Sequence, residues 1–301
     1  MILIFLTDFQ LSFLKSSLQG CKIIYNPNYD SEIINEYISD IRVLITYRTS
    51  IDDILQMDNL LFVQVYGSGK DGIPADYLTK KGILFKASKG ECMGNAVAEY
   101  VLMSILIWER NLFNLNAIAK TGAWDWIGRN EISFRSLSCL RVGIVGVGLI
   151  GSKVKSILEQ HSTSVYELVL DRNEMNDELF NTVNNMDYIT VHLQLEELTD
   201  GIIGKVFFEA MNDHAVFINT SRAGVVIEED LIVALKKKCI RGASIDTTSK
   251  EPLPFFNPFV NLDNVIITPH CSARTESALL ENIGIIVNNI KEVIYRGFIQ
   301  T

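Results

Sequence analysis

The sequence predicts an α/β protein with two doubly wound parallel sheets, and three observations lead to this prediction. Short apolar runs alternate with amphipathic segments along most of the chain, which is typical of strands that alternate with helices. A long apolar segment, residues 95–112, separates two such series. The second series opens with an apolar run that leads directly into the glycine pattern Gly146-x-Gly148-x-x-Gly151.

The first series contains five short apolar runs that we expect to be strands, at residues 2–6, 22–25, 43–46, 62–65 and 83–85. Between them, residues 30–38 and 51–55 have helical spacing. The first run follows no basic region and is followed closely by Asp8. We therefore interpret it as a buried strand rather than as a signal sequence or a membrane span.

Residues 95–112 carry apolar side chains at helical spacing and predict a buried helix that crosses between two domains. A polar connector follows at 120–135. The second series then has expected strands at 142–145, 165–170, 188–193, 215–219, 242–246 and 265–268, and a closing helix at 276–295. We expect a domain of residues 95–275 inserted into a smaller domain that consists of residues 1–94 and 276–301.

Composition narrows the function classes. The chain has 301 residues, a hydrophobic fraction of 48% and a net charge of −9. An acidic chain whose one basic run, Lys236–Lys238, closes an apolar helical stretch is a poor candidate for binding nucleic acid or an anionic membrane. The five cysteines are scattered and include no C-x-x-C pair. This pattern favours reduced thiols in a cytoplasmic protein over disulfides or a metal site.

The glycine pattern predicts a dinucleotide site. Gly146 allows the tight turn, Gly148 lets the backbone approach a pyrophosphate, and Gly151 lets the following helix pack closely on the strand. The amides at the start of that helix would then face the phosphates. Such a pattern is weak alone, but here an apolar strand precedes it and a helical segment at 152–160 follows.

An acidic residue suited to the adenosine ribose follows at the expected distance. Asp171 lies 20 residues after Gly151, at the end of the expected strand 165–170. Its carboxylate would accept hydrogen bonds from the ribose hydroxyls, which favours NAD over NADP. Arg172 is adjacent and could instead contact the 2′-phosphate of NADP, so NADP stays the alternative.

Three later segments supply a cation, a carboxylate and a histidine, in that order. Arg222 can pair with a substrate carboxylate and polarise a keto oxygen. His270 can move a proton to or from that oxygen. Glu251, which we expect to be buried, would orient the imidazole and favour its charged form. Together with a dinucleotide, these groups are what hydride transfer to a 2-keto acid requires.

In order and local context, these segments resemble the D-isomer-specific 2-hydroxyacid dehydrogenase family. Asn219-Thr220-Ser221-Arg222-Ala223-Gly224 is similar to the family's "NTARGG", Glu251-Pro252-Leu253 to "EPL", and Thr268-Pro269-His270 to "TPH". Val191-His192-Leu193 matches the start of "VHLPLTPET", and residues 67–71 match "GxGxD". The resemblance is strong from about residue 142 to 271 and loose before it.

The resemblance implies a Rossmann-type nucleotide domain inserted into a flavodoxin-like substrate domain. It implies NAD(P)-dependent interconversion of a small 2-keto acid and a D-2-hydroxy acid, with Arg222, Glu251 and His270 as the catalytic residues, in a homodimer. Ser68, Gly69 and Arg222 would bind the substrate. The remaining implied cofactor contacts, beside the three glycines and Asp171, come from Leu149, Ile150, Leu193, Gln194, Thr199, Thr220 and Asp246.

Other interpretations use the same residues. A non-catalytic, NAD-sensing corepressor can keep Arg222, Glu251 and His270, whereas a formate-type dehydrogenase carries glutamine where this chain has Glu251. Cys271, which follows the key histidine, could act as a nucleophile, but a small residue in a tight loop is the simpler interpretation. We expect His192 to be structural rather than catalytic.

Overall fold

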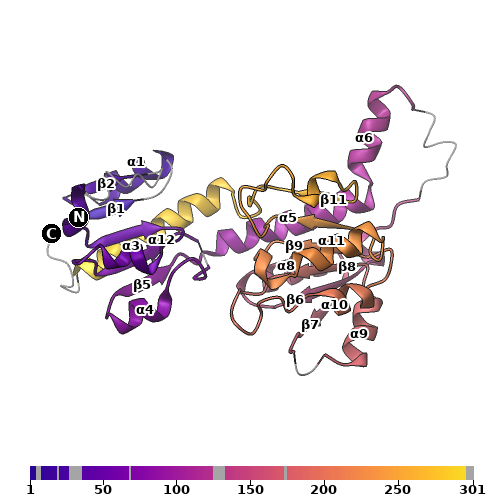
Figure 1. Ribbon diagram of the computed structural model, residues 1–301. Coiled ribbons are helices and arrows are strands. Elements are labelled where there is room, and N and C mark those ends of the chain that lie inside the picture. Colours follow the sequence, from indigo (N-terminus) through magenta and orange to yellow (C-terminus); the bar gives the residue numbers. More distant parts are fainter. Residues whose placement is uncertain are drawn as a thin grey trace. The chain divides into compact units, whose positions relative to one another are not determined.

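The computed structural model describes residues 1–4, 8–18, 20–26, 36–67, 69–124, 133–172 and 175–295 (Figure 1). The chain forms two compact units. The first unit consists of Met1–Cys92 and Thr275–Thr301, and the second unit of Met93–Arg274. Most of the expected helix at 30–38 and much of the connector at 120–135 lie outside the described residues.

The first unit is built on a five-stranded parallel sheet. Its strands are β1 (Ile2–Ile4), β2 (Ile23–Tyr25), β3 (Val43–Thr46), β4 (Phe62–Val65) and β5 (Leu84–Ala87). Their order is β2-β1-β3-β4-β5, and every neighbouring pair is parallel. This is the strand order of flavodoxin-like folds.

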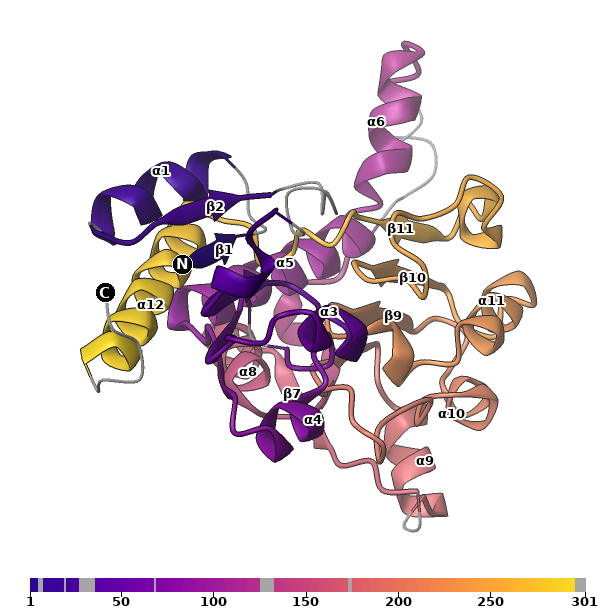
Figure 2. The ribbon, with the colours of Figure 1, turned by 60° about the vertical axis from the view of Figure 1, so that its left-hand side comes forward.

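Both faces of this sheet are covered, which explains why its strands are continuous apolar runs. In β3, Val43 and Ile45 pack in one buried cluster and Leu44 packs in the other, because successive side chains point to opposite faces. The first cluster includes Ile283 and Ile286 of α12 (Glu276–Tyr295), which packs against α1 (Asp8–Ser17) and β4 (Figure 2). The other helices are α3 (Ile51–Leu55), α4 (Ala75–Lys80) and the 3₁₀ turn η1 (Ile38–Asp40).

The second unit is built on a six-stranded parallel sheet. Its strands are β6 (Arg141–Val145), β7 (Ser164–Leu168), β8 (Tyr188–Val191), β9 (Val216–Asn219), β10 (Gly242–Ile245) and β11 (Val265–Ile267), in the order β11-β10-β9-β8-β6-β7. The chain passes from β6 to β7 on one side and returns to β8 on the other side. Ligands of open parallel sheets bind at such a switch point, beyond the carboxyl ends of the strands. The predicted fold class is confirmed.

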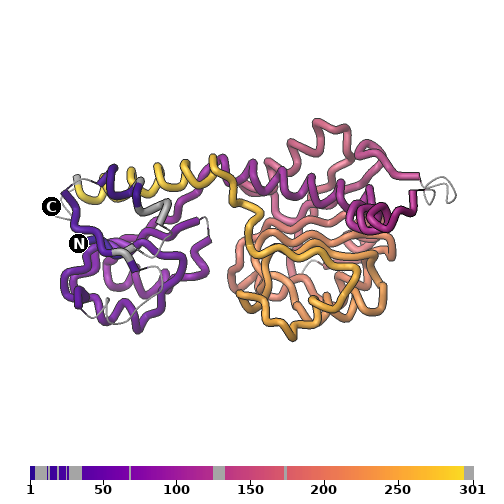
Figure 3. Tube along the Cα trace, turned by 90° about the horizontal axis from the view of Figure 1, so that it is seen from above, coloured from indigo at the N-terminus to yellow at the C-terminus, as the bar shows by residue number. Residues whose placement is uncertain are grey.

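Helices cover both faces of the second sheet. On one face lie α5 (Glu91–Glu109) and α8 (Leu149–Gln160), whose backbones can be followed in Figure 3. They bury Val101, Ile105 and Leu158 against the strands. On the other face lie α9 (Asp177–Asn184), α10 (Lys205–Ala210) and α11 (Glu228–Lys236). The unit also contains α6 (Leu112–Lys120) and the 3₁₀ turns η2 (Leu137–Cys139), η3 (Ala223–Val225) and η4 (Pro258–Asn261).

The observed elements differ from the expected ones where tertiary contacts set their ends. α5 begins at Glu91 rather than at 95, because the carboxylate of Glu281 accepts hydrogen bonds from the Glu91 and Cys92 amides (3.1 and 2.7 Å). The left-handed Asn111 (φ 47°) follows its end. β7 ends at Leu168, opposite Val145, because its one partner, β6, leaves the sheet at Gly146.

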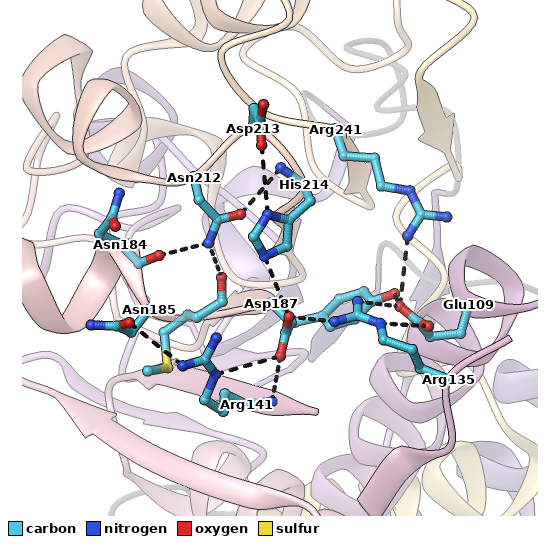
Figure 4. Close-up of polar contacts among 12 residues, drawn as sticks. Glu109, Arg135, Arg141, Asn184, Asn185, Asp187, Asn212, Asp213, His214 and Arg241 are labelled. Carbon is cyan, nitrogen blue, oxygen red and sulfur yellow. Dashed lines mark hydrogen bonds and ion pairs between the residues drawn. The ribbon is translucent and has the colours of Figure 1, made fainter. Parts of the chain in front are cut away.

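Two buried carboxylates close the amino ends of the second sheet (Figure 4). Asp187, directly before β8, accepts hydrogen bonds from the Arg141 amide (2.7 Å) and from Arg135 (2.5 Å). The Nε2 atom of His214, just before β9, lies 3.6 Å from the same carboxylate. Asp187 therefore links the starts of β6, β8 and β9.

The second carboxylate, Glu109, ends α5. Arg135 donates to both of its oxygens (2.9 and 3.3 Å), and the Tyr188 hydroxyl donates at 2.6 Å. Burial, followed by this hydrogen bond to Glu109, raises the pKa of Tyr188, so the phenol stays protonated and donates. Arg241 lies 3.6 Å away, directly before β10. Arg135 is thus the group that neutralises both buried carboxylates.

We predict that Arg135→Ala lowers the free energy of unfolding by about 2–3 kcal/mol, because two buried carboxylates lose their common partner. The loss stays below the maximum for a buried pair because Arg135 is itself 38% exposed and water can partly replace it. Urea unfolding followed by circular dichroism measures the change. Lys155→Ala, which removes the surface pair with Glu167 (2.7 Å), serves as the control and should change little. Equal effects of the two substitutions would contradict this account.

Candidate functional site

The turn between β6 and α8 has the shape that a dinucleotide pyrophosphate requires. Gly146 has φ +88°, and a β-carbon there would lie 2.8 Å from Leu193 Cδ2. At Gly151 a β-carbon would lie 2.1 Å from the Gly146 carbonyl oxygen. At Gly148, by contrast, no described atom lies within 4 Å of that position. The turn is therefore closely packed at Gly146 and Gly151, and it leaves free space at Gly148, directly before α8. At the start of α8, Leu149 is exposed and Ile150 is half-buried. A phosphate group fits this arrangement.

The acidic residue after β7 does not occupy the strand end. Because β7 ends at Leu168, the first position beyond it is Val169, which is 79% exposed, and Asp171 lies two residues farther on. Asp171 is exposed as well. The Arg172 guanidinium donates hydrogen bonds to the backbone carbonyls of Leu198 and Asp200. The expectation that Asp171 closes the strand was therefore wrong, whereas its role toward ribose stays a prediction.

The loop after β8 borders the glycine turn. Leu193 contributes the methyl group that faces Gly146, and a β-carbon at Gly146 would also meet the His192 carbonyl. Thr199 donates a hydrogen bond to the Gln194 carbonyl (2.6 Å) and accepts one from the Glu196 amide (2.9 Å). Thr199 therefore closes this loop on itself, and Leu193 and Gln194 are held beside the turn.

His192 lies between two hydroxyl groups. Its Nε2 atom is 3.0 Å from Thr190 Oγ1, and its Nδ1 atom is 3.4 Å from Thr220 Oγ1. His192 is half-buried, and burial lowers the pKa of His192 to about 3. The ring is therefore neutral at physiological pH. It links β8 to the first residue after β9, which agrees with the predicted structural role.

Arg222 lies on a tight turn after β9 that Asn219 organises. The Asn219 side-chain oxygen accepts hydrogen bonds from the Ser221 amide (3.0 Å) and hydroxyl (2.9 Å), and its amide group donates to the Arg222 carbonyl (3.2 Å). The half-buried guanidinium of Arg222 donates to the Ser221 carbonyl (3.0 Å). The turn thus holds Arg222 and the buried Thr220 at the carboxyl end of the sheet.

His270 and Glu251 form the expected pair. The Nδ1 atom of His270 lies 2.9 Å from Glu251 Oε2, and the other oxygen of Glu251 accepts a hydrogen bond from the Thr248 amide (3.2 Å). The Nε2 atom is then directed away from the pair and is suited to face a substrate. The burial predicted for Glu251 was wrong, because the side chains of His270 and Glu251 are 47% and 41% exposed. The loop that carries Glu251 follows β10 at the surface and lies outside the packed sheet.

Asp246, at the carboxyl end of β10, is almost fully buried and holds the loop that carries His270. Its carboxylate accepts hydrogen bonds from the amides of Cys271 (2.8 Å) and Ser272 (2.9 Å) and from the Thr268 hydroxyl (2.6 Å). Its carbonyl accepts one from the His270 amide (2.9 Å). Asp246 is therefore the residue that fixes the loop from Thr268 to Ser272 by hydrogen bonds. A contact of Asp246 with a cofactor stays a prediction.

Cys271 has the properties of a structural thiol. Burial, followed by the nearby charge of Asp246, raises the pKa of Cys271, so the thiolate is disfavoured. A nucleophilic role is therefore not supported.

In the first unit, the loop after β4 is the expected substrate loop. Gly67 has φ +101°, which only glycine adopts easily, and its amide donates to the Ser88 hydroxyl (2.8 Å). Gly69 is half-buried. Ser68 lies outside the described residues. The ammonium group of Lys70, which follows Gly69, lies 5.3 Å from the centre of the Phe85 ring.

Sequence reasoning missed three residues that support this site. Asn219 organises the Arg222 turn, and Tyr100 and Thr268 contact the network around Asp246. An asparagine at the end of a strand, two residues before a serine, was a usable signal for a turn. Tyr100 carried no such signal, because its apolar ring fits the helical pattern of a core residue. In the described part of the chain, no group of three His, Cys, Asp or Glu side chains could hold a metal ion.

The chain is similar to known proteins along most of its length. Residues 102–272 match the D-isomer specific 2-hydroxyacid dehydrogenase, NAD binding domain. A D-3-phosphoglycerate dehydrogenase of Methanocaldococcus jannaschii is 31% identical over 87% of this chain and 52% of its own length. A glyoxylate reductase of Thermofilum pendens is 29% identical over 94% and 88%, and a mouse glyoxylate reductase/hydroxypyruvate reductase is 31% identical over 72% and 69%. The chain spans about half the length of two phosphoglycerate dehydrogenases that it matches in sequence.

Solved structures share the fold. A D-lactate dehydrogenase from Aquifex aeolicus, complexed with NAD and lactic acid, superposes with a TM-score of 0.86 over 98% of this chain and 95% of its own, at 21% identity. A glyoxylate/hydroxypyruvate reductase from Sinorhizobium meliloti, in complex with NADP and malonate, gives 0.82 over 97% and 92%, at 19% identity. At such identities the likeness shows the fold alone.

The lowered pKa of His192 predicts a pH dependence of stability. The folded protein keeps this ring neutral, whereas the unfolded chain binds a proton below about pH 6.5. The free energy of unfolding should therefore fall as the pH drops from about 6.5 toward 3, by about 1.4 kcal/mol per pH unit for this group. His192→Gln keeps polar contacts but removes the titration. Urea unfolding gives the free energy of unfolding of both proteins at pH 7.5 and at pH 5.0. Between these two values the variant should lose about 2 kcal/mol less than wild type. Equal losses in the two proteins would contradict the assignment.

Proposed function

The chain belongs to the D-isomer specific 2-hydroxyacid dehydrogenase family, and on this basis we propose that it interconverts a small 2-keto acid and the corresponding D-2-hydroxy acid. The observation that carries the proposal is the 2.9 Å pair of His270 and Glu251. It lies beyond the same carboxyl edge of the second sheet as the glycine turn and Arg222. In this proposal residues 95–275 form the dinucleotide-binding domain, and residues 1–94 and 276–301 form the substrate domain.

Each residue of the proposed site has one task. The glycine turn between β6 and α8 would hold the dinucleotide, and NADH bound there would supply a hydride for the keto carbon. Arg222 pairs with the substrate carboxylate. Roles of Ser68 and Gly69 toward the same carboxylate stay predictions from the resemblance. His270 gives a proton from Nε2 to the keto oxygen. Glu251 accepts a hydrogen bond from Nδ1 and so keeps the ring in place.

NAD is the proposed cofactor, although relatives of this fold bind NAD or NADP. Asp171 repels a 2′-phosphate and can accept hydrogen bonds from ribose hydroxyls. The competing cation, Arg172, already donates to the carbonyls of Leu198 and Asp200. These contacts favour NAD over NADP.

The names of the relatives set the substrate panel. Glyoxylate, hydroxypyruvate, 3-phosphohydroxypyruvate and pyruvate should be offered with NADH, and the loss of NADH absorbance recorded. Turnover of at least one supports the proposal. Tight NADH binding without any turnover would instead favour the NAD-sensing corepressor.

We propose that a second copy of the chain covers α6. None of the nine residues of this helix is buried, and Leu112 and Phe113 are 51% and 58% exposed. Exposed apolar side chains on a helix are typical of an interface between subunits. Light scattering of the purified protein tests the proposed homodimer.

We also propose a cytoplasmic location, which the cysteines support. All five lie within the described residues, and none is in a disulfide. No helix in the described part of the chain is long and apolar enough to cross a membrane.

We predict that Arg222→Lys lowers kcat/KM at least tenfold although the charge is kept. A lysine is a point charge and cannot present the paired donors that a carboxylate accepts from a guanidinium. Steady-state kinetics with the best keto acid of the panel measure the loss, and unchanged NADH binding by fluorescence shows that the site is intact. A variant within about threefold of wild type, under roughly 0.7 kcal/mol, would remove Arg222 from the site.

His270→Ala should cost about 10²–10⁴-fold in kcat, because it removes the proton donor. Glu251→Gln should lower kcat by a smaller factor. The loss of charge weakens the support of His270, but glutamine can still accept the hydrogen bond from Nδ1. NADH affinity should stay nearly constant in both variants. If His270→Ala retains wild-type turnover, the proton comes from another group.

A further inference from the structure

Tyr100 reaches the buried carboxylate of Asp246 through one intermediate hydroxyl group. Its phenolic oxygen lies 2.6 Å from Thr268 Oγ1, and that atom lies 2.6 Å from Asp246 Oδ1. Thr268 donates its single hydroxyl hydrogen to Asp246 Oδ1. Tyr100 must then donate to Thr268. The direction of both hydrogen bonds is thus determined by Asp246.

The series of hydrogen bonds that begins at Tyr100 ends at the backbone that carries His270. Asp246 accepts hydrogen bonds from three consecutive amides, those of His270, Cys271 and Ser272, at 2.8–2.9 Å. Together these bonds hold the loop from His270 to Ser272 at the end of β10. A shift of Asp246 would be transmitted to all three residues, through its backbone carbonyl to His270 and through its carboxylate to Cys271 and Ser272.

The conformation of His270 requires such support. Its φ is +50°, in the left-handed region that costs a residue with a β-carbon roughly 1–2 kcal/mol. The His270 amide donates to the carbonyls of both Asp246 and Thr268 (2.9 and 3.0 Å), and these bonds hold that conformation. The direction of the imidazole, and hence its pairing with Glu251, follows from this backbone.

We propose that Tyr100 is a positioning residue, which holds the proton-donating His270 in place through Thr268 and Asp246. This inference rests on the proposed function only for the role of His270 in catalysis. The contacts themselves belong to the second unit alone. Tyr100 is a buried residue of α5, and its hydroxyl contacts the Thr268 hydroxyl directly. Burial raises the pKa of Tyr100, which keeps the phenol protonated as the donor.

The same helix provides a matched control. Trp108, two turns farther along α5, donates a hydrogen bond from its Nε1 atom to the buried Ser244 hydroxyl (2.9 Å). Ser244 belongs to β10 and lies two residues before Asp246. Trp108→Phe and Tyr100→Phe therefore each remove one hydrogen bond between α5 and the β10–β11 region. Only the second of these bonds leads to the His270 loop.

The experiment compares kcat, KM, the solvent deuterium isotope effect on kcat and the melting temperature of both variants with wild type. We expect Tyr100→Phe to lower kcat about three- to tenfold, as the loss of one hydrogen bond would, with KM for NADH nearly unchanged. The solvent isotope effect should rise, because transfer of the proton from a displaced His270 becomes slower. Trp108→Phe should lower the melting temperature without changing kcat or the isotope effect. Equal kinetic effects of the two variants, or none, would overturn the proposal.

Thr268 allows a test by conservative rescue. Thr268→Ser keeps the hydroxyl and both hydrogen bonds, whereas Thr268→Val keeps the shape and removes both. We expect Thr268→Val to lower kcat at least as much as Tyr100→Phe, and Thr268→Ser to stay within about twofold of wild type. A serine variant as slow as the valine variant would show that the methyl group matters, and would overturn the relay.

A spectroscopic measurement separates this inference from the proposed function. The chain has four histidines, so ¹³C-labelled histidine gives four imidazole signals, and His270→Ala assigns one of them. Tyr100→Phe should shift or broaden the His270 signal, and Trp108→Phe should leave it in place. If this occurs in a protein that reduces no keto acid, the positioning stands and the proposed function fails. If turnover is present but the signal does not move, the positioning fails.

Discussion

Parallel pairing of six strands is the constraint on which the candidate site depends. Because every strand of the second sheet runs in the same direction, every carboxyl end opens at one edge, and helices must return the chain to the other edge. Gly146, Leu193, Arg222, Asp246 and His270 each follow a different strand. Residues far apart in the sequence are thereby gathered at one edge of the sheet. The switch between β6 and β8 gives the edge its opening for a dinucleotide.

The two edges of this sheet are stabilised by opposite means. At the amino ends, the buried carboxylates of Glu109 and Asp187 are neutralised by arginines and bonded to the starts of the strands. At the carboxyl ends, the deeply buried carboxylate of Asp246 is satisfied mainly by backbone amides. Backbone donors hold a loop in one conformation and leave the side chains beyond it, such as His270, available for a substrate. The amino-end edge therefore stabilises the fold, whereas the carboxyl-end edge leaves side chains accessible for the candidate site.

The sequence predicted the parts of this protein that depend on local patterns. The three glycines predict a strand, a tight turn and a helix in that order, since each glycine solves a local steric problem that the structure reproduces. The pairing of His270 with Glu251 followed from the resemblance of two short motifs. What the sequence could not show depends on contacts between distant segments. The end of β7 at Leu168 depends on where β6 departs, and the start of α5 depends on Glu281. Tyr100 has the pattern of a core residue, and only the fold brings its hydroxyl to Thr268.

The most direct test of the central claim follows the hydride itself. NADH that carries deuterium at C4 of the nicotinamide, on the transferable face, is incubated with the protein and the preferred keto acid of the panel. The account predicts a D-2-hydroxy acid with deuterium at carbon 2, seen by NMR and by chiral chromatography, and almost none with His270→Ala. An L-hydroxy acid, or a product without the label, would contradict it.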